Sequence, residues 1–139
     1  MKFLVFSIFV CISFCDSKKI SIIEITQNNI DENRIINTIY SSIEKEIRIL
    51  EGYILQPRNQ TFPIIENEIP EITSCDIGCL SSIGSLIDTD LMIIGRLIRS
   101  GISYTLNLEI FNVNKNIIQK KIKINSNKGV MKLLANLKK

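Results

Sequence analysis

Two cysteines, Cys75 and Cys79, are the side chains in this sequence best suited to chemistry. They stand four residues apart, a spacing that places both thiols on one face of a helix. A disulfide between them would pin the first turn of that helix and close a very short loop, so its entropic stabilisation should be small. Two other interpretations stay open: a pair of small buried hydrophobic side chains, or a redox-active pair with a reactive thiolate at a helix N-terminus.

Other groups that carry catalysis are missing from the sequence. It contains no histidine, no Gly-rich phosphate loop after a strand and no Gly-x-Ser-x-Gly motif. Without histidine, two cysteines also make a poor zinc site. Asp76, Asp88 and Asp90 form a small acidic group, but helix capping and turn formation explain these residues better than metal binding. We therefore expect no enzymatic activity, no cofactor and no metal.

The composition indicates one globular domain. The chain has 139 residues, of which 45% are hydrophobic and 22% are charged. Its net charge of +3 is too weak and too evenly spread to indicate nucleic acid as a partner.

The first 17 residues have the pattern of a secretory signal peptide. Lys2 supplies a positive charge, and Phe3–Phe14 is an apolar run too short to span a bilayer, which needs roughly 20 residues. We expect residues 1–17 to be removed and the mature protein to be periplasmic or otherwise exported. Alternatively, Ile12-Ser-Phe-Cys15 is a poor lipobox, in which case Cys15 would carry the lipid of a membrane-anchored lipoprotein. Export in either form favours a disulfide between the two cysteines above.

Residues 18–139 are predicted to form a single α/β domain. A β-branched strand covers 19–26, and an amphipathic helix covers 31–50, ends at Gly52 and leads into a short strand at 53–56. Residues 57–70 hold all three prolines and are expected to form a surface loop, with room for one short helical turn. The apolar stripe of the helix consists of Ile36, Ile39, Tyr40, Ile43, Ile47 and Leu50.

The second half of the domain begins with a helix that ends near residue 87. Thr73 and Asp76 have the spacing of a loose capping box ahead of it. Gly84 lies in the middle of its apolar face, where glycine costs about 1 kcal/mol relative to alanine, and this favours a close approach of the helix to a sheet. Leu91–Gly95 is a continuous apolar run, typical of a strand covered on both faces. Two alternating strands at 104–110 and 118–125 complete an antiparallel meander, and residues 128–139 form a basic amphipathic helix.

The predicted order of elements is therefore β-α-β-α-β-β-β-α, which places the chain in the α/β (α+β mixed) class. The β-α-β steps favour parallel crossovers, and the last three strands favour hairpins. We predict a five-stranded mixed sheet in which the first strand lies between the second and the third, with helices on one or both faces.

The sequence resembles a family of bacterial envelope α/β domains. The matching residues run from Lys19 to Ile25, from Cys75 to Gly95, which includes Gly84, and from Tyr104 to Val113. They are similar to a pattern of two cysteines, structural glycines and an apolar run in CsgG-like and LpoB-like lipoproteins and in the amino-terminal domain of TolB. The chain departs from this pattern at the turn after Asn112, and it has no long insertion for membrane hairpins, which argues against a pore.

The resemblance implies a TolB amino-terminal-domain-like fold and an accessory or assembly module that acts through contacts with envelope proteins. Gly84 and Gly95 would be structural glycines of that fold. Contact with a membrane is expected only if Cys15 carries a lipid, and assembly of several copies of the chain stays open. Two alternative functions are an exported thiol-disulfide protein that uses Cys75 and Cys79, and a module that binds a peptide or small ligand at the exposed edge of the meander.

Overall fold

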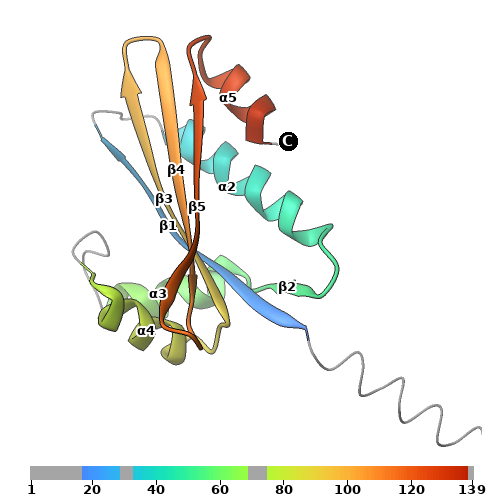
Figure 1. The fold of residues 1–139 in the computed structure, drawn as a ribbon, viewed down its shortest axis with the longest axis vertical. Coiled ribbons are helices and arrows are strands. Elements are labelled where there is room, and N and C mark those ends of the chain that lie inside the picture. The colour runs from blue at the N-terminus through green and yellow to red at the C-terminus, as the bar shows by residue number, and fades with distance from the viewer. Residues whose placement is uncertain (1–16, 29–32, 69–74, 138–139) are drawn as a thin grey trace, which may run out of the picture.

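The computed structural model describes residues 17–28, 33–68 and 75–137 (Figure 1). All of the predicted signal peptide except Ser17 therefore lies outside the described residues. Cys15 and Thr73 of the proposed capping box also lie outside them. The elements in chain order are β1 (Lys18–Asn28), α2 (Asn33–Arg48), β2 (Tyr53–Leu55), α3 (Arg58–Glu68), α4 (Ile77–Leu86), β3 (Leu91–Ser100), β4 (Ser103–Asn112), β5 (Ile117–Ser126) and α5 (Val130–Leu137).

The five strands form one mixed sheet in the order β2-β1-β3-β4-β5. β1 runs parallel to both β2 and β3, and β3, β4 and β5 form an antiparallel meander. The prediction of a five-stranded mixed sheet with the first strand between the second and the third is confirmed. β2 pairs only with the first three residues of β1, Lys18–Ile20, so no strand among the described residues pairs with the rest of that edge of β1.

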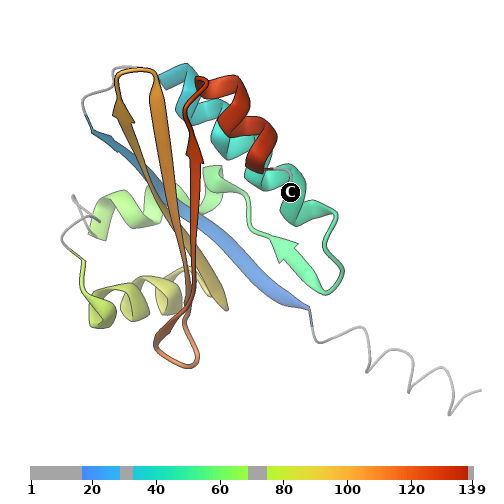
Figure 2. The ribbon, with the colours of Figure 1, turned by 45° about the horizontal axis from the view of Figure 1, so that its top comes forward.

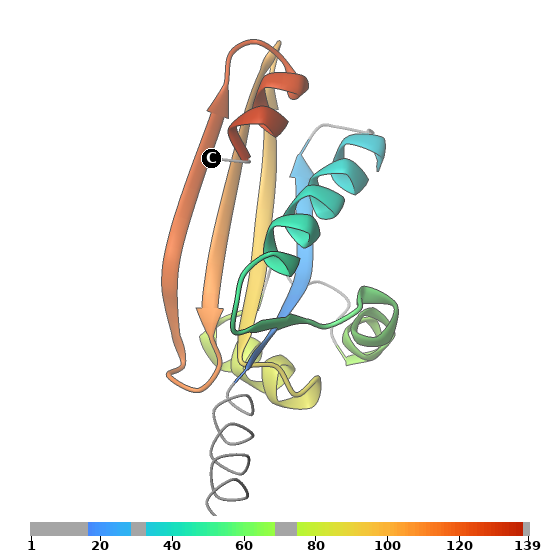
Figure 3. The same cartoon turned by 90° about the vertical axis from the view of Figure 1, so that its right-hand side faces the viewer.

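Helices cover the two faces of the sheet unequally. α2 and α5 lie side by side on one face (Figure 2), where Ile39 and Leu133 pack with Ile22 of β1. α3 and α4 contribute to a second, smaller core that holds Met92 of β3 and Phe111 of β4. In Figure 3 the strands β3, β4 and β5 extend well above α4. The described helices therefore cover the second face only near the end where β3 begins.

The amphipathic pattern of α2 predicts its buried face correctly for five of six residues. The buried residues are Ile36, Ile39, Tyr40, Ile43 and Ile47. The placement of Leu50 on this stripe is wrong, because the helix ends at Arg48 and the chain turns through Gly52 at a φ of +80°. Leu50 is consequently exposed.

The helix α3 covers Arg58–Glu68, where the prolines indicated a surface loop over 57–70. The prediction of a loop is therefore wrong for the residues of α3. Pro63 lies inside the helix, where it removes a single intrahelical hydrogen bond. Thr61 and Ile65, one turn apart, are both buried and hold the helix against the sheet. The guanidinium of Arg58 stacks 3.5 Å from the ring centroid of Tyr40, which joins α3 to α2.

The connection between α4 and β3 ties that end of the molecule to β1. The backbone N–H of Lys19 donates to Asp90 Oδ2 at 2.8 Å, and Lys19 Nζ lies 2.6 Å from Asp88 Oδ2. The hydroxyl of Thr89, buried between them, donates to the carbonyl of Lys19 at 3.1 Å. Asp88 and Asp90 thus stabilise the turn that leads into β3, as the sequence favours.

Candidate functional site

The uncovered part of the second sheet face presents two rows of side chains from four strands, and all of these side chains except Ile94 are polar. The register places Glu24, Ile94, Glu109 and Lys121 in one row, and Thr26, Arg96, Asn107 and Lys123 in the next. We call these eight residues the open face. A ten-residue helix such as α4 is about 15 Å long, whereas ten residues of strand extend about 33 Å, so α4 cannot cover β3 from end to end.

The open face is hollowed next to α4. A hollow with a volume of about 740 Å³ is lined by residues of β1, β3, β4 and β5, and by Cys75 and Leu80 at the start of α4. This volume lies within the range of about 300–1,000 Å³ typical of binding sites for small ligands. The hollow is open to solvent along the sheet, so it also suits an extended polypeptide segment.

Charges of both signs lie on the open face. Lys121 Nζ and Glu109 Oε1 are 3.3 Å apart on neighbouring strands, and Arg96 is exposed. Burial raises the pKa of Glu24, which is half-buried beside Ile94. A surface with charges of both signs favours a partner that also carries both positive and negative groups, and it disfavours a uniformly charged polymer.

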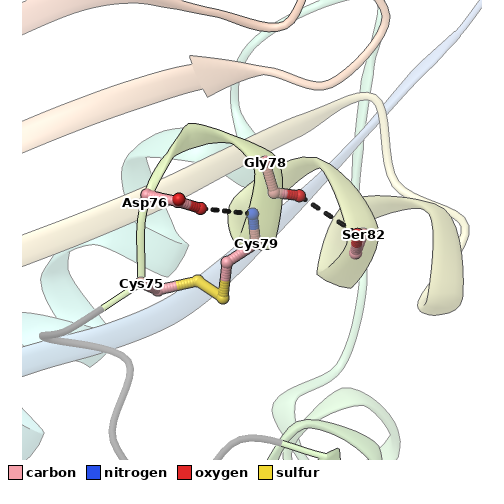
Figure 4. The surroundings of a disulfide bond; sticks show 5 residues. All are labelled: Cys75, Asp76, Gly78, Cys79 and Ser82. Carbon is pink, nitrogen blue, oxygen red and sulfur yellow. Dashed lines mark hydrogen bonds between the residues drawn. A yellow bond between two sulfur atoms is a disulfide. The ribbon is translucent and has the colours of Figure 1, made fainter.

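Figure 4 shows the disulfide between Cys75 and Cys79, of which Cys75 lines the hollow. Cys75 and Cys79 are bonded across the first turn of α4, with their Cα atoms 5.3 Å apart. Asp76 is the N-cap, since its Oδ1 accepts the N–H of Cys79 at 2.8 Å. The bond and the cap together fix the part of α4 that faces the open face.

Both glycines singled out in the sequence lie in tight packing. A Cβ at Gly84 would lie 2.4 Å from Cγ2 of Val113, which follows β4. A Cβ at Gly95 would lie 2.9 Å from Cδ2 of Leu108 and 3.1 Å from Cγ1 of Ile25. Gly84 lets α4 approach the β4–β5 turn, and Gly95 lets β3 pass between the apolar side chains of its two neighbours.

The structure brings together residues that the sequence did not group. The alternation predicted over 104–110 puts Thr105, Asn107 and Glu109 on the polar side of one strand, and it is the signal in the sequence for the open face. Glu24 was missed because its strand is mostly apolar. Among the described residues, no three His, Cys, Asp or Glu side chains are close enough to hold a metal ion. Within the same residues, every helix is too short or too polar to cross a bilayer.

No protein-family model matches the chain, and no curated protein matches it in sequence. Solved structures do match. The LpoB C-terminal domain from Escherichia coli has a TM-score of 0.60 at 8% identity, over 81% of this chain and 84% of that one. Lipoprotein GNA1162 from Neisseria meningitidis has a TM-score of 0.58 at 8% identity, over 81% of each chain. TolB from Acinetobacter baumannii has a TM-score of 0.50 at 13% identity, over 86% of this chain but only 25% of its own length.

These matches establish a shared fold. The resemblance drawn from the sequence to LpoB-like lipoproteins and to TolB is confirmed at this level, and so is the predicted TolB-like α/β class. The chain has the α/β fold of envelope lipoproteins, and nearly the whole described domain takes part in the match.

Proposed function

We propose that the chain is an exported, non-enzymatic accessory or assembly module of the cell envelope that binds a protein partner through the open face. The observation that carries this proposal is the hollow beside α4, which is lined by side chains of four strands and bordered by Cys75 and Leu80. The apolar segment Phe3–Phe14 supports export, and the fold shared with lipoprotein GNA1162 supports a place in the envelope.

The open face offers groups suited to a polypeptide partner. Asn107 and Thr26 can donate and accept hydrogen bonds, and Arg96 and Lys123 can pair with carboxylates. The partner would lie against the rim formed by Cys75 and Leu80. The open face is a better candidate than the outer edge of β5, because exposed lysines along β5 are typical of edges that avoid pairing with another strand.

Site-specific photo-crosslinking in the native host tests the proposal. A photoreactive residue at Asn107 or Lys123 should capture the same envelope protein, because both positions line the hollow. The matched control is Asn37, an exposed polar residue on the outer side of α2. Equal capture from Asn37, or none from either open-face position, would count against a partner at this surface.

Charge reversal gives a second readout of the same surface. Arg96→Glu combined with Lys123→Glu should weaken capture from Asn107 about tenfold or more, because like charges would then meet the acidic groups of the partner. Arg34→Glu, an exposed change at the start of α2, should leave capture unchanged. If the double variant leaves capture from Asn107 unchanged, the charges of Arg96 and Lys123 do not contribute to binding of the partner.

The second candidate function is thiol-disulfide exchange. It is favoured by the position of the Cys75–Cys79 disulfide, at a helix N-terminus and on the rim of the hollow. This function requires a thiol that reacts with a partner, so Cys79→Ser should trap a mixed disulfide through Cys75. A variant that traps nothing and leaves the phenotype of the host unchanged would leave the disulfide with a structural role alone.

Mature mass distinguishes the two forms of export. A soluble product that begins near Asp16 or Lys18 would be a free periplasmic module. A lipid-modified Cys15 would make the protein an anchored lipoprotein.

A further inference from the structure

Exposed apolar side chains gather at the end of the domain where β1 begins. The turn after α2 and the short strand β2 expose Ile49 by 71%, Leu50 by 51%, Tyr53 by 37% and Ile54 by 54%. These four belong to six consecutive residues, whereas the other exposed large hydrophobic residues of the described chain are spread over the rest of the sequence. We call this segment, residues 49–54, the apolar end. A concentration of this kind marks an interaction surface more often than chance exposure.

The N-terminal segment enters the domain at the same place. The N–H of Lys18 donates to the carbonyl of Gly52 at 2.9 Å, and Lys18 pairs with Tyr53 in the sheet. Cys15 is three residues before Lys18, a span of at most about 11 Å for an extended chain. Attachment of the protein to a membrane at Cys15 would therefore bring the apolar end against the lipid headgroups.

The residues around the apolar end suit a membrane surface. Three basic side chains, Lys18, Lys45 and Arg48, lie around the apolar end, together with two acidic ones, Glu46 in the last turn of α2 and Glu51 in the turn after it. Basic side chains next to exposed apolar ones are the composition of surfaces that bind anionic bilayers. Tyr53 has an apolar ring and a polar hydroxyl, a combination enriched at the level of the headgroups.

We propose that the apolar end is a membrane-docking surface, on which the domain rests against the phospholipid bilayer that its N-terminal segment reaches. The proposal rests on the export proposed above. It adds an orientation, because docking at residues 49–54 leaves the open face, farther along β1, directed away from the lipid.

A single tryptophan tests this docking directly, because the chain contains none. Leu50→Trp is placed in the mature protein as its host processes it, and the protein is mixed with vesicles of phosphatidylethanolamine and phosphatidylglycerol that carry brominated acyl chains. We expect the emission to shift to shorter wavelength and to fall about twofold or more, as a residue in the headgroup region would. The matched control is Ile102→Trp, which replaces a side chain that is 74% exposed at the opposite end of β3; its emission should not change.

Ile49→Asp and Ile54→Asp, added to Leu50→Trp, should abolish the quenching while the circular dichroism spectrum stays the same, because both side chains are exposed. Three results would overturn the proposal: no quenching at Leu50→Trp, equal quenching at Ile102→Trp, or quenching that survives the two aspartates. A shift that appears without vesicles as protein concentration rises would instead assign the apolar end to contacts between copies of the chain. Crosslinking from Asn107 reports on the open face alone, so the two proposals can fail separately.

Discussion

Gly84→Ala is expected to destabilise the domain although it replaces a glycine inside a helix. In an unobstructed helix the change would stabilise by about 1 kcal/mol. Here the new Cβ would lie 2.4 Å and 2.8 Å from the two methyl carbons of Val113, against about 3.5–4.0 Å for an ordinary carbon contact. Val113 is β-branched and stiff at χ1, so a rotation that clears one methyl brings the other into contact.

The magnitude follows from the difference of these two effects. Overpacking of this kind costs about 1–3 kcal/mol, and both methyls of Val113 are affected, which favours the upper half of the range. After subtraction of the helical gain, Gly84→Ala should lower the free energy of unfolding by about 1–2 kcal/mol. Urea unfolding followed by far-ultraviolet circular dichroism, with an unchanged m-value, measures this difference.

Two further variants identify the contact as the cause. Gly78→Ala changes a glycine of the same helix whose Cβ would meet nothing nearer than Asp76 Oδ1, at 3.5 Å, so it should be neutral or stabilising by up to about 1 kcal/mol. Val113→Ala should relieve the crowding, so that Gly84→Ala stabilises the protein in that background. The contact between α4 and the β4–β5 turn is refuted if Gly84→Ala alone raises stability as Gly78→Ala does.

Three other predictions concern the core, the disulfide and the open face. Tyr40→Phe should destabilise by about 1–3 kcal/mol in urea unfolding, since the N–H of Ile25, which donates to the tyrosine oxygen at 2.7 Å, loses its buried acceptor. Replacement of Cys75 and Cys79 by serine should cost no more than about 2 kcal/mol by the same measurement, because the loop that the bond closes is short. Burial raises the pKa of Glu24 above its ordinary value of 4.5. The stability that protonated Glu24 contributes is therefore full below pH 4.5 and is lost as the pH rises through the folded-state pKa. Glu24→Gln should remove this loss of stability in unfolding curves recorded from about pH 4.5 to neutrality.

Elements with a regular pattern could be predicted from the sequence, because their burial follows from local periodicity. The stripe of α2 is read from Ile36 to Ile47, and the alternation in β4 places Leu106 and Leu108 inside and Asn107 outside. The order of the strands followed from the lengths of the connections, which separate parallel crossovers from hairpins.

The helix α3 could not be predicted in this way, because it is stabilised by contacts with distant parts of the chain. Its sequence has little amphipathic character and contains Pro63, both of which indicate a loop. The helix is held by burial of Ile65 in the second core and by the stacking of Arg58 on Tyr40 of α2. Neither partner can be identified before the tertiary fold is known.

The sequence predicts which side chains of β4 lie on the open face, but it does not predict that this face stays uncovered. The polar side of β4 shows which residues point away from the larger core, but not whether a helix covers them. Coverage depends on the length of α4 and on where Gly84 and Val113 bring it against the sheet. Because α4 ends its contact near the start of β3, the rows through Glu24 and Thr26 stay exposed to a partner.

The length of β1 relates the two proposed surfaces to one another. Glu24 and Thr26 follow Lys18 by six and eight residues, and a strand rises about 3.3 Å per residue, so they lie about 20–26 Å from the apolar end. The hydrogen bonds from Lys19 to Asp90 and from Gln56 to the carbonyl of Ile20 fix the start of this strand to the turns on both sides. With the apolar end on a bilayer, this strand would hold a partner on the open face at most about 26 Å from the lipid surface, close enough for a protein that is itself attached to the same membrane.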